Sequence, residues 1–240
     1  MKVIASWSGG KDSCLAAYKA RQAGHELACL LNFVSREYKR CCFHGIEAKL
    51  MRLQAELMGI PIFQAEVTAD MKEYEREFKA AVRELKQKHG VEGMVFGDVY
   101  LDEHREWVER VCADLEIKPI EPLWGLPARQ VVLEFIGAGF KSVVTSCKSD
   151  LFGREFVGRF MDAALVDELV ARNICPCGEN GEFHTFVVAG PSFAGEIRLQ
   201  ETEPILKKGF WEHWFLDIKR YETTEAGSAA TAAPTGSSSK

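Results

Sequence analysis

The stretch VIASWSGGKDSCLAAY, residues 3–18, joins a short apolar run to a segment whose apolar residues have helical spacing. The first part predicts a buried strand over residues 3–7, and the last part predicts a helix from about Asp12. A glycine-rich turn in this context is typical of anion-binding loops, because the helix directs its backbone N–H groups and its positive dipole end at the turn. The residues of the turn are Ser8, Gly9, Gly10, Lys11, Asp12 and Ser13.

Each residue type in this turn suits a phosphate chain. The glycines let backbone N–H groups approach phosphate oxygens, and Lys11 adds a full positive charge. Ser8 and Ser13 carry hydroxyl donors. Asp12 would repel phosphate by itself, but its carboxylate is a suitable Mg²⁺ ligand. The turn therefore predicts a site for ATP with magnesium.

Familiar alternatives fit the turn less well. A Walker P-loop requires a glycine at the position of Ala5 and a serine or threonine at the position of Asp12. The dinucleotide motif GxGxxG is also absent from the turn. An ordinary turn capped by a serine would explain one or two of its residues but not the whole set.

The rest of the chain extends an α/β pattern. Over residues 1–120, apolar runs alternate with amphipathic segments, which predicts a parallel, Rossmann-like nucleotide-binding domain with helices on both faces of its sheet. Residues 121–221 end in strand patterns and predict a smaller α+β substrate domain. Residues 222–240 are poor in apolar side chains and predict a disordered tail. The expected strands are 27–34, 62–67, 94–96, 117–120, 142–145 and 183–188, and the expected helices are 46–58, 72–89, 103–115, 128–137 and 156–171.

Composition limits the classes of partner. The net charge of -5 over 240 residues leaves no basic excess, so the sequence carries no strong nucleic-acid signal. No segment reaches the ~18 apolar residues of a membrane span and the N-terminus lacks the pattern of a secretion signal, which predicts a cytoplasmic protein. The eight cysteines lie mostly in helix-like or strand-like runs and are expected to be reduced thiols. The oligomeric state is left open, a homo-oligomer included.

Beyond these arguments, SGGKDS resembles the pyrophosphate loop of the N-type ATP pyrophosphatases, in the PP-loop superfamily. Further stretches resemble the diphthine-ammonia ligase family, which also includes uncharacterised bacterial relatives. The resemblance extends over nearly the whole chain, to about Arg198. These stretches are CCFHGIEAKLMRLQAELMGIP, GDVYLDEHREWVERVCADLEIKPIEPLWG, VGRFMD and CGENGEFHTFV.

The resemblance implies an adenine nucleotide alpha hydrolase-like fold and an ATP-dependent, amide-forming ligase. A substrate carboxylate would attack the α-phosphorus, pyrophosphate would leave, and ammonia would displace AMP from the acyl adenylate. The implied carboxylate is that of diphthine, a modified histidine on the translocating elongation factor. Free ammonium is the expected nitrogen source, because no glutaminase segment is apparent. Lys11, Ser8 and Ser13 would stabilise the departing pyrophosphate.

Further candidate site residues lie at the ends of predicted strands and in or at the start of predicted helices. Gly97 and Asp98 come at the carboxyl end of a predicted strand, where open parallel sheets bind ligands. We expect both to contact ATP, and Asp98 to bind Mg²⁺ together with Asp12. Arg105 is expected to contact the substrate, although a solvated helix face explains it equally well. His44 opens a predicted helix, and its resemblance to a histidine of the family favours a substrate-binding role.

The stretch CGENGEFHT, residues 177–185, is a second signal for a site. Glu179 and Glu182 are candidate catalytic residues on a loop that leads into a predicted strand. Two roles are open to them, binding a cation such as ammonium or a trimethylammonium group, or accepting a proton from the attacking ammonia. An acidic hairpin turn is the purely structural alternative. The companions expected to bind substrate are Asn180, Gly181, His184 and Thr185.

Several alternatives remain open at this stage. A sister enzyme would activate a different carboxylate, and a non-catalytic adenine-nucleotide sensor would bind ATP without releasing pyrophosphate. A transfer-RNA-modifying pyrophosphatase would need a basic face that the sequence does not show. A zinc site is an alternative role for the two cysteine pairs and the histidines near them, although neither pair has the common ligand spacing. Its ligands would come from Cys41, Cys42, His44, Cys175, Cys177 and His184.

Overall fold

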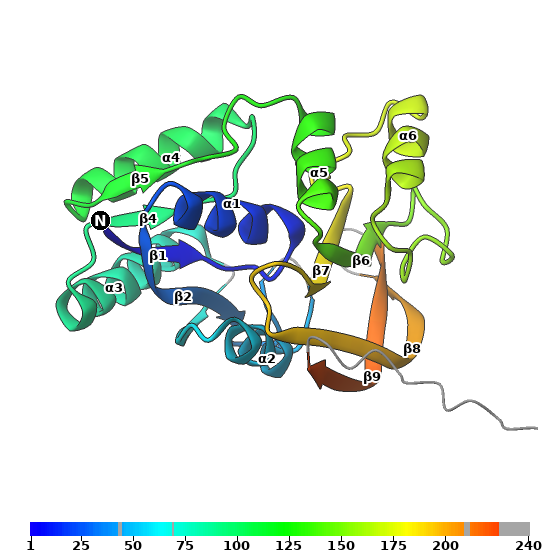
Figure 1. Cartoon of the computed structure of the whole chain (residues 1–240), viewed down its shortest axis with the longest axis horizontal. Helices are drawn as coiled ribbons and strands as arrows, with labels where there is room; N and C mark the ends of the chain where they lie inside the picture. Colours follow the sequence, from blue (N-terminus) through cyan, green and yellow to red (C-terminus); the bar gives the residue numbers. More distant parts are fainter. Residues whose placement is uncertain (43–44, 69, 209–211, 226–240) are drawn as a thin grey trace, which may run out of the picture.

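The structure, a computed structural model, describes residues 1–42, 45–68, 70–208 and 212–225. The first half of the chain forms a five-stranded parallel sheet, and the second half forms a four-stranded antiparallel sheet (Figure 1). The predicted class, α/β with a Rossmann-like first half and an α+β second half, is therefore confirmed. Among the described residues, no helix combines the length and the apolar character needed to cross a membrane.

The parallel sheet has the strand order β3-β2-β1-β4-β5, with β1 at its centre. The chain first adds strands on one side of β1 and then crosses over to add β4 and β5 on the other side. Open parallel sheets bind ligands at the carboxyl ends of the strands where the winding reverses in this way. The elements are β1 (Lys2–Ser6), α1 (Lys11–Gln22), β2 (Glu26–Ser35), α2 (Ala48–Met58), β3 (Ile62–Val67), α3 (Met71–His89), β4 (Gly93–Val95), α4 (Asp102–Asp114) and β5 (Lys118–Ile120).

The side chains of β1 explain why helices cover both faces of this sheet. Val3 and Ala5 belong to a buried cluster that includes residues of α1 and α2. Ile4 belongs to a second buried cluster, which includes residues of α3 and α4. Successive side chains of a strand point to opposite faces, so the apolar run of β1 can bury a helix layer on each side.

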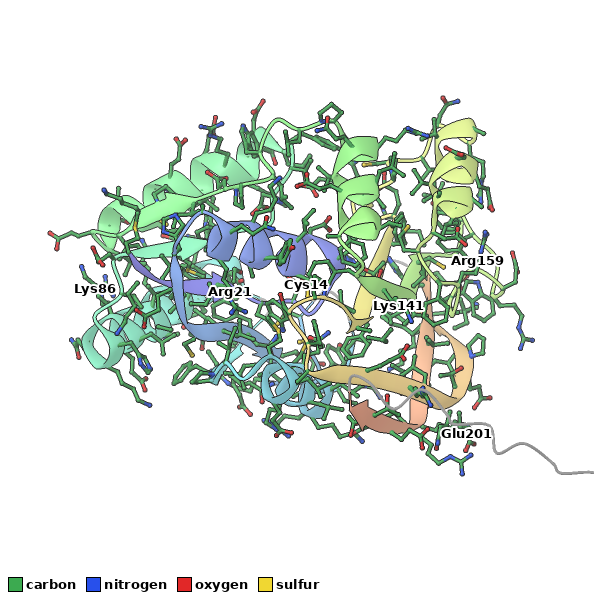
Figure 2. All side chains as sticks on the ribbon, in the orientation of Figure 1. Cys14, Arg21, Lys86, Lys141, Arg159 and Glu201 are labelled. Carbon is green, nitrogen blue, oxygen red and sulfur yellow. The ribbon has the colours of Figure 1, made fainter. Side chains whose placement is uncertain are left out.

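The antiparallel sheet continues the core of the first half. Its strand order is β7-β6-β9-β8, and α5 and α6 lie side by side next to it (Figure 1). Phe135 of α5 and Phe186 of β7 share one buried cluster with Cys14 of α1. Figure 2 shows side chains in the space between α1 and α5, around Cys14. The two halves are therefore joined by one continuous core. The elements are α5 (Ala128–Gly137), β6 (Lys141–Lys148), α6 (Ala163–Ala171), β7 (Phe183–Ala189), β8 (Gly195–Lys208) and β9 (Glu212–Glu225).

One predicted helix begins later than the sequence pattern indicates. The expected helix over residues 156–171 is shorter in the structure, where α6 begins at Ala163. Gly158 has a φ of 91°, a conformation that interrupts a helix. Asp162 then caps α6, because its carboxylate accepts a hydrogen bond from the Leu165 N–H at 2.8 Å.

The expected tail over residues 222–240 begins too early. Strand β9 continues to Glu225 and pairs with β8 over the whole of its length. Thr223 and Thr224 are β-branched and suit a strand, although they lack the apolar side chains that mark strands in the sequence. Residues 226–240 lie outside the described residues.

Candidate active site

The turn between β1 and α1 lies at the carboxyl edge of the parallel sheet and borders a cleft of about 210 Å³. We call residues 8–13 the N-terminal loop and residues 177–185 the acidic loop. Together with the segment after β4, these loops form the walls of the cleft. The lining residues are Ser6, Ser8, Lys11, Asp12, Ser13, Gly97, Asp98, His104, Cys177, Gly178, Glu179, Phe183, His184 and Thr185.

Gly9 allows the N-terminal loop to pack closely against α2. Its φ is +73°, and a Cβ atom there would lie 2.5 Å from the Met51 Sδ and 2.6 Å from the Gln54 Oε1. A positive φ and such close neighbours together exclude larger side chains. Gly10 is the N-cap of α1 and has a φ of -86°. Neither glycine is among the residues that line the cleft, and Gly9 packs closely against Met51 and Gln54.

A buried glutamine ties the N-terminal loop to the second sheet. The Gln54 Nε2 donates hydrogen bonds to the Gly9 carbonyl at 3.0 Å and to the Val187 carbonyl at 2.7 Å. Its Oε1 accepts a hydrogen bond from the Trp7 indole N–H at 3.0 Å. One side chain thus connects the segment after β1, α2 and β7. Sequence reasoning missed Gln54, although a glutamine on the apolar face of a predicted helix was the available signal.

Lys11 places a fixed positive charge beside the cleft. Its side chain is 3% exposed, and its Nζ donates to the Asp12 Oδ2 at 2.8 Å and to the Cys177 carbonyl. Burial lowers the pKa of Lys11, but the charge and hydrogen bond of Asp12 outweigh this effect, so the pKa lies above its ordinary value. The Lys11 backbone N–H donates to the Thr185 Oγ1 at 3.1 Å. Lys11 therefore contacts the acidic loop with both its backbone and its side chain.

Asp12 has one carboxylate oxygen without a hydrogen-bond partner. Its Oδ2 pairs with Lys11, whereas its buried Oδ1 is unpaired. Burial raises the pKa of Asp12, and the charge of Lys11 opposes that rise. A buried, unpaired carboxylate oxygen beside a cleft suits a bound cation. Ser8 and Ser13 line the same cleft, and their hydroxyl oxygens lie 3.1 Å apart.

The segment after β4 approaches the N-terminal loop closely. A Cβ atom on Gly97 would lie 2.9 Å from both the Asp12 carbonyl carbon and the Ser13 nitrogen, so glycine is required there. The Oδ1 of Asp98 lies 2.9 Å from the Nδ1 of His104, in the first turn of α4. This hydrogen bond raises the pKa of His104. His104 lines the cleft but was not predicted, because its neighbours read as a solvated helix face.

The two glutamates of the acidic loop have different surroundings. Glu179 lines the cleft, and its Oε1 accepts a hydrogen bond from the Val99 N–H at 2.9 Å. Burial, with the charges of nearby carboxylates, raises the pKa of Glu179 to about 7. Glu182 accepts hydrogen bonds from the Asn180 backbone N–H at 2.9 Å and from its side-chain amide at 3.2 Å. Glu182 therefore closes the turn and does not line the cleft.

Of the other predicted residues of the acidic loop, two line the cleft and two belong to the turn. His184 and Thr185 line the cleft. Gly181 has a φ of +73° and belongs to the turn. The Asn180 amide also donates to the Tyr100 hydroxyl at 3.0 Å, so its contacts are within the protein.

Arg105 lies apart from the lining of the cleft. Its Nε pairs with the Glu109 carboxylate at 2.8 Å, and its guanidinium lies 4.9 Å from the centre of the Trp124 ring. These contacts fit the alternative of a solvated helix face. His44, also expected to bind substrate, lies outside the described residues.

Three side chains at the cleft are close enough to share a metal ion. One ligand atom each of Asp98, His104 and Glu179 lies within 4.8 Å of the other two. Within the described part of the chain, this is the only such group of three or more histidine, cysteine, aspartate or glutamate side chains. Among the described residues, no cysteine belongs to such a group, and His44 of the alternative zinc site lies outside the described residues.

Comparison with known proteins gives concordant matches over most of the chain. A family model described as the diphthamide synthase N-terminal domain matches residues 1–119, and the corresponding C-terminal domain model matches residues 128–224. A zebrafish protein named diphthine–ammonia ligase is 26% identical over 227 residues, covering 86% of this chain and 89% of the relative. The human protein of that name is 24% identical over 233 residues, covering 86% and 85%.

A solved structure was also matched, described as a predicted subunit of tRNA methyltransferase from Methanocaldococcus jannaschii. It has a TM-score of 0.45 and 17% identity, and the match covers 79% of this chain and 97% of that chain. The two family models account for both halves of the fold, and the curated relatives extend over most of their own length. The chain belongs to the diphthamide synthase family, the diphthine-ammonia ligases.

Proposed function

We propose that this chain is an ATP-dependent ligase of the diphthamide pathway. It adenylates the carboxylate of diphthine and amidates it with ammonia, and AMP and pyrophosphate leave. The observation that carries the proposal is that the N-terminal loop and the acidic loop line one cleft, with Lys11 in contact with both. The N-terminal loop, which suits phosphate, and the acidic loop, which carries Glu179, thus border the same cleft. Family membership supports the same reaction.

In this proposal the N-terminal loop stabilises the departing pyrophosphate. Lys11 supplies a permanent positive charge, and the hydroxyls of Ser8 and Ser13 supply donors within the cleft. Charges and donors held in place before the reaction do not have to reorganise as negative charge develops on the leaving group. The chain therefore contributes mainly by positioning the reactants and neutralising charge.

Asp12 suits a magnesium ligand, because its buried Oδ1 lacks a protein partner. Bound there, Mg²⁺ would offset the negative charge of the ATP phosphates. Asp98 was the second residue expected to bind magnesium. One of its oxygens already pairs with His104, and Asp98 lines the same cleft as Asp12, on the segment after β4.

We assign different roles to the two glutamates. Glu179 suits the first of the roles open to them, binding a cation, because its carboxylate lines the cleft. Glu182 acts as a positioning residue, since its carboxylate holds the turn at Asn180. The macromolecular partner in this proposal is the translocating elongation factor that carries diphthine.

The test is the release of AMP and pyrophosphate from ATP with magnesium and ammonium, with and without the diphthine-bearing elongation factor. We expect release only when that factor is present, and loss of release in Lys11→Ala. Glu103→Gln is the matched control, because Glu103 is exposed on α4 and does not line the cleft. ATP binding without release would favour the nucleotide sensor. If release depends on a different carboxylate, that carboxylate and not diphthine is the substrate.

A further inference from the structure

We propose that Asp98, His104 and Glu179 bind a divalent transition-metal ion, Mn²⁺, Co²⁺ or Zn²⁺, at a site separate from the magnesium that accompanies ATP. The three residues come from the segment after β4, the first turn of α4 and the acidic loop. Their ligand atoms lie within 4.8 Å of one another, although Glu179 is far from Asp98 and His104 in the sequence. The fold, and not a local motif, brings them together.

The mixture of ligand types indicates which class of ion the site takes. Magnesium prefers an octahedral shell of oxygen ligands and keeps several waters. An imidazole nitrogen beside two carboxylates suits borderline metals such as Co²⁺ and Zn²⁺, and Mn²⁺, which prefers oxygen ligands, can use the two carboxylates of the same set. Three protein ligands also leave coordination positions open toward the cleft.

The charge of the cleft is an independent reason to expect a cation. Asp12, Asp98 and Glu179 all line the cleft, and Lys11 is the one lysine or arginine among the lining residues of the described chain. Lys11 already pairs with the Asp12 Oδ2, so no lysine or arginine of the described lining is left to balance Asp98 and Glu179. A wall with excess carboxylates would repel ATP unless positive ions are bound along it.

The existing contacts leave ligand atoms available at all three side chains. The Val99 N–H binds the Glu179 Oε1, which leaves Oε2 for an ion. The His104 Nδ1 contacts the Asp98 Oδ1, which leaves the Asp98 Oδ2 and the His104 Nε2. The His104 side chain is 54% exposed and can rotate, whereas Asp98 is 23% exposed and more confined. An ion at this place would link the acidic loop to α4 and add positive charge beside the N-terminal loop.

The test is a titration of the metal-free 240-residue chain with MnCl₂, followed by electron paramagnetic resonance without ATP. We expect bound Mn²⁺ to show the pulsed-resonance modulation of an imidazole nitrogen in the wild-type chain. His104→Ala should remove this modulation and weaken Mn²⁺ binding by about tenfold or more. Glu103→Gln removes a neighbouring exposed carboxylate and should change the affinity by less than about threefold.

Asp12→Asn distinguishes the proposed site from the magnesium site, because the nitrogen modulation should persist in that variant. Circular dichroism of each variant checks that the chain is folded. Bound Mn²⁺ without nitrogen modulation would overturn the proposal, as would equal Mn²⁺ affinity in wild type and folded His104→Ala. Binding lost in Asp12→Asn but unchanged in His104→Ala would mean that the ion occupies only the magnesium site. The test uses neither ATP nor elongation factor, so it can fail while the ligase proposal stands.

Discussion

The N-terminal loop and the acidic loop meet in one cleft, but their side chains relate to it differently. In the N-terminal loop, every polar side chain lines the cleft, and Gly9 serves close packing. In the acidic loop, Glu179 lines the cleft while Glu182 turns back to hold Asn180. In the first loop, the glycine with positive φ, Gly9, precedes a helix with regular side-chain directions. In the second loop, Gly178 and Gly181, with φ angles of 66° and 73°, lie on either side of Glu179.

The difference between the two loops shows how far the residue type alone indicates the role of a side chain. At the start of α1, a lysine and an aspartate next to each other form an ion pair beside the cleft. Within a glycine turn, two identical glutamates separate into a cleft residue and a structural residue. Variants of the two loops can test whether Lys11 and Glu179 act at the cleft while Glu182 is structural.

The largest expected effect is that of removing the buried charge of the N-terminal loop. Lys11→Ala should lower substrate-dependent pyrophosphate release by about 10²–10³-fold, the range found when a preorganised donor to a developing charge is removed. Steady-state release measured at saturating ATP checks this prediction. Release within tenfold of wild type in the folded variant would contradict the assignment of Lys11 to the pyrophosphate.

The second prediction sharpens the comparison within the acidic loop. Glu179→Gln should lower ligase activity by about 100-fold, because a preorganised charge is lost from the cleft, while the thermal midpoint stays close to that of wild type. Glu182→Gln should cost about 1–2 kcal/mol of stability through weakened hydrogen bonds at Asn180, with activity within about tenfold. Activity assays and thermal unfolding of both variants provide the measurement. The reverse pattern would exchange the two roles.

The third prediction concerns the packing of the N-terminal loop. Gly9→Ala should destabilise the chain by about 2–4 kcal/mol, because it adds backbone strain and a clash with Met51 and Gln54. Gly24 is a matched control, since its φ is +85° and a Cβ atom there meets nothing within 4 Å. Gly24→Ala should cost about 1–2 kcal/mol from strain alone. Equal losses in denaturant titrations would show that the contact with α2 contributes nothing.

The smallest effect is expected outside both loops. Arg105→Ala should change pyrophosphate release by less than about threefold, because the exposed pair with Glu109 and the stacking on Trp124 both lie away from the cleft lining. A comparison of kcat/KM for the elongation factor checks this prediction. A large rise in KM would instead support the substrate-binding role expected from the sequence.

Much of this architecture could be predicted because it depends on local patterns. The alternation of apolar runs and amphipathic segments predicted the parallel sheet, and the turn chemistry placed residues 8–13 at its edge. The residue at which a helix begins is harder to predict from sequence. In α6, Gly158 has a positive φ within an otherwise helical pattern, and the helix begins only after the cap at Asp162.

The parts of the site that were not predicted depend on tertiary contacts. Gln54 joins segments that are 45 and 133 residues away, and nothing in its own helix indicates those partners. His104 meets Asp98 six residues away and Glu179 across the cleft, which requires the two halves to be packed together. The different roles of Glu179 and Glu182 likewise follow from backbone angles that glycine permits but does not specify.

The most direct test of the central claim is an ATP–pyrophosphate exchange assay in the absence of ammonium. Formation of an acyl adenylate is reversible, so labelled pyrophosphate should enter ATP when the diphthine-bearing factor is present. We predict exchange that requires this substrate and is lost in Lys11→Ala. No exchange in this assay, together with release of ADP and phosphate when ammonium is then added, would contradict the account of both loops.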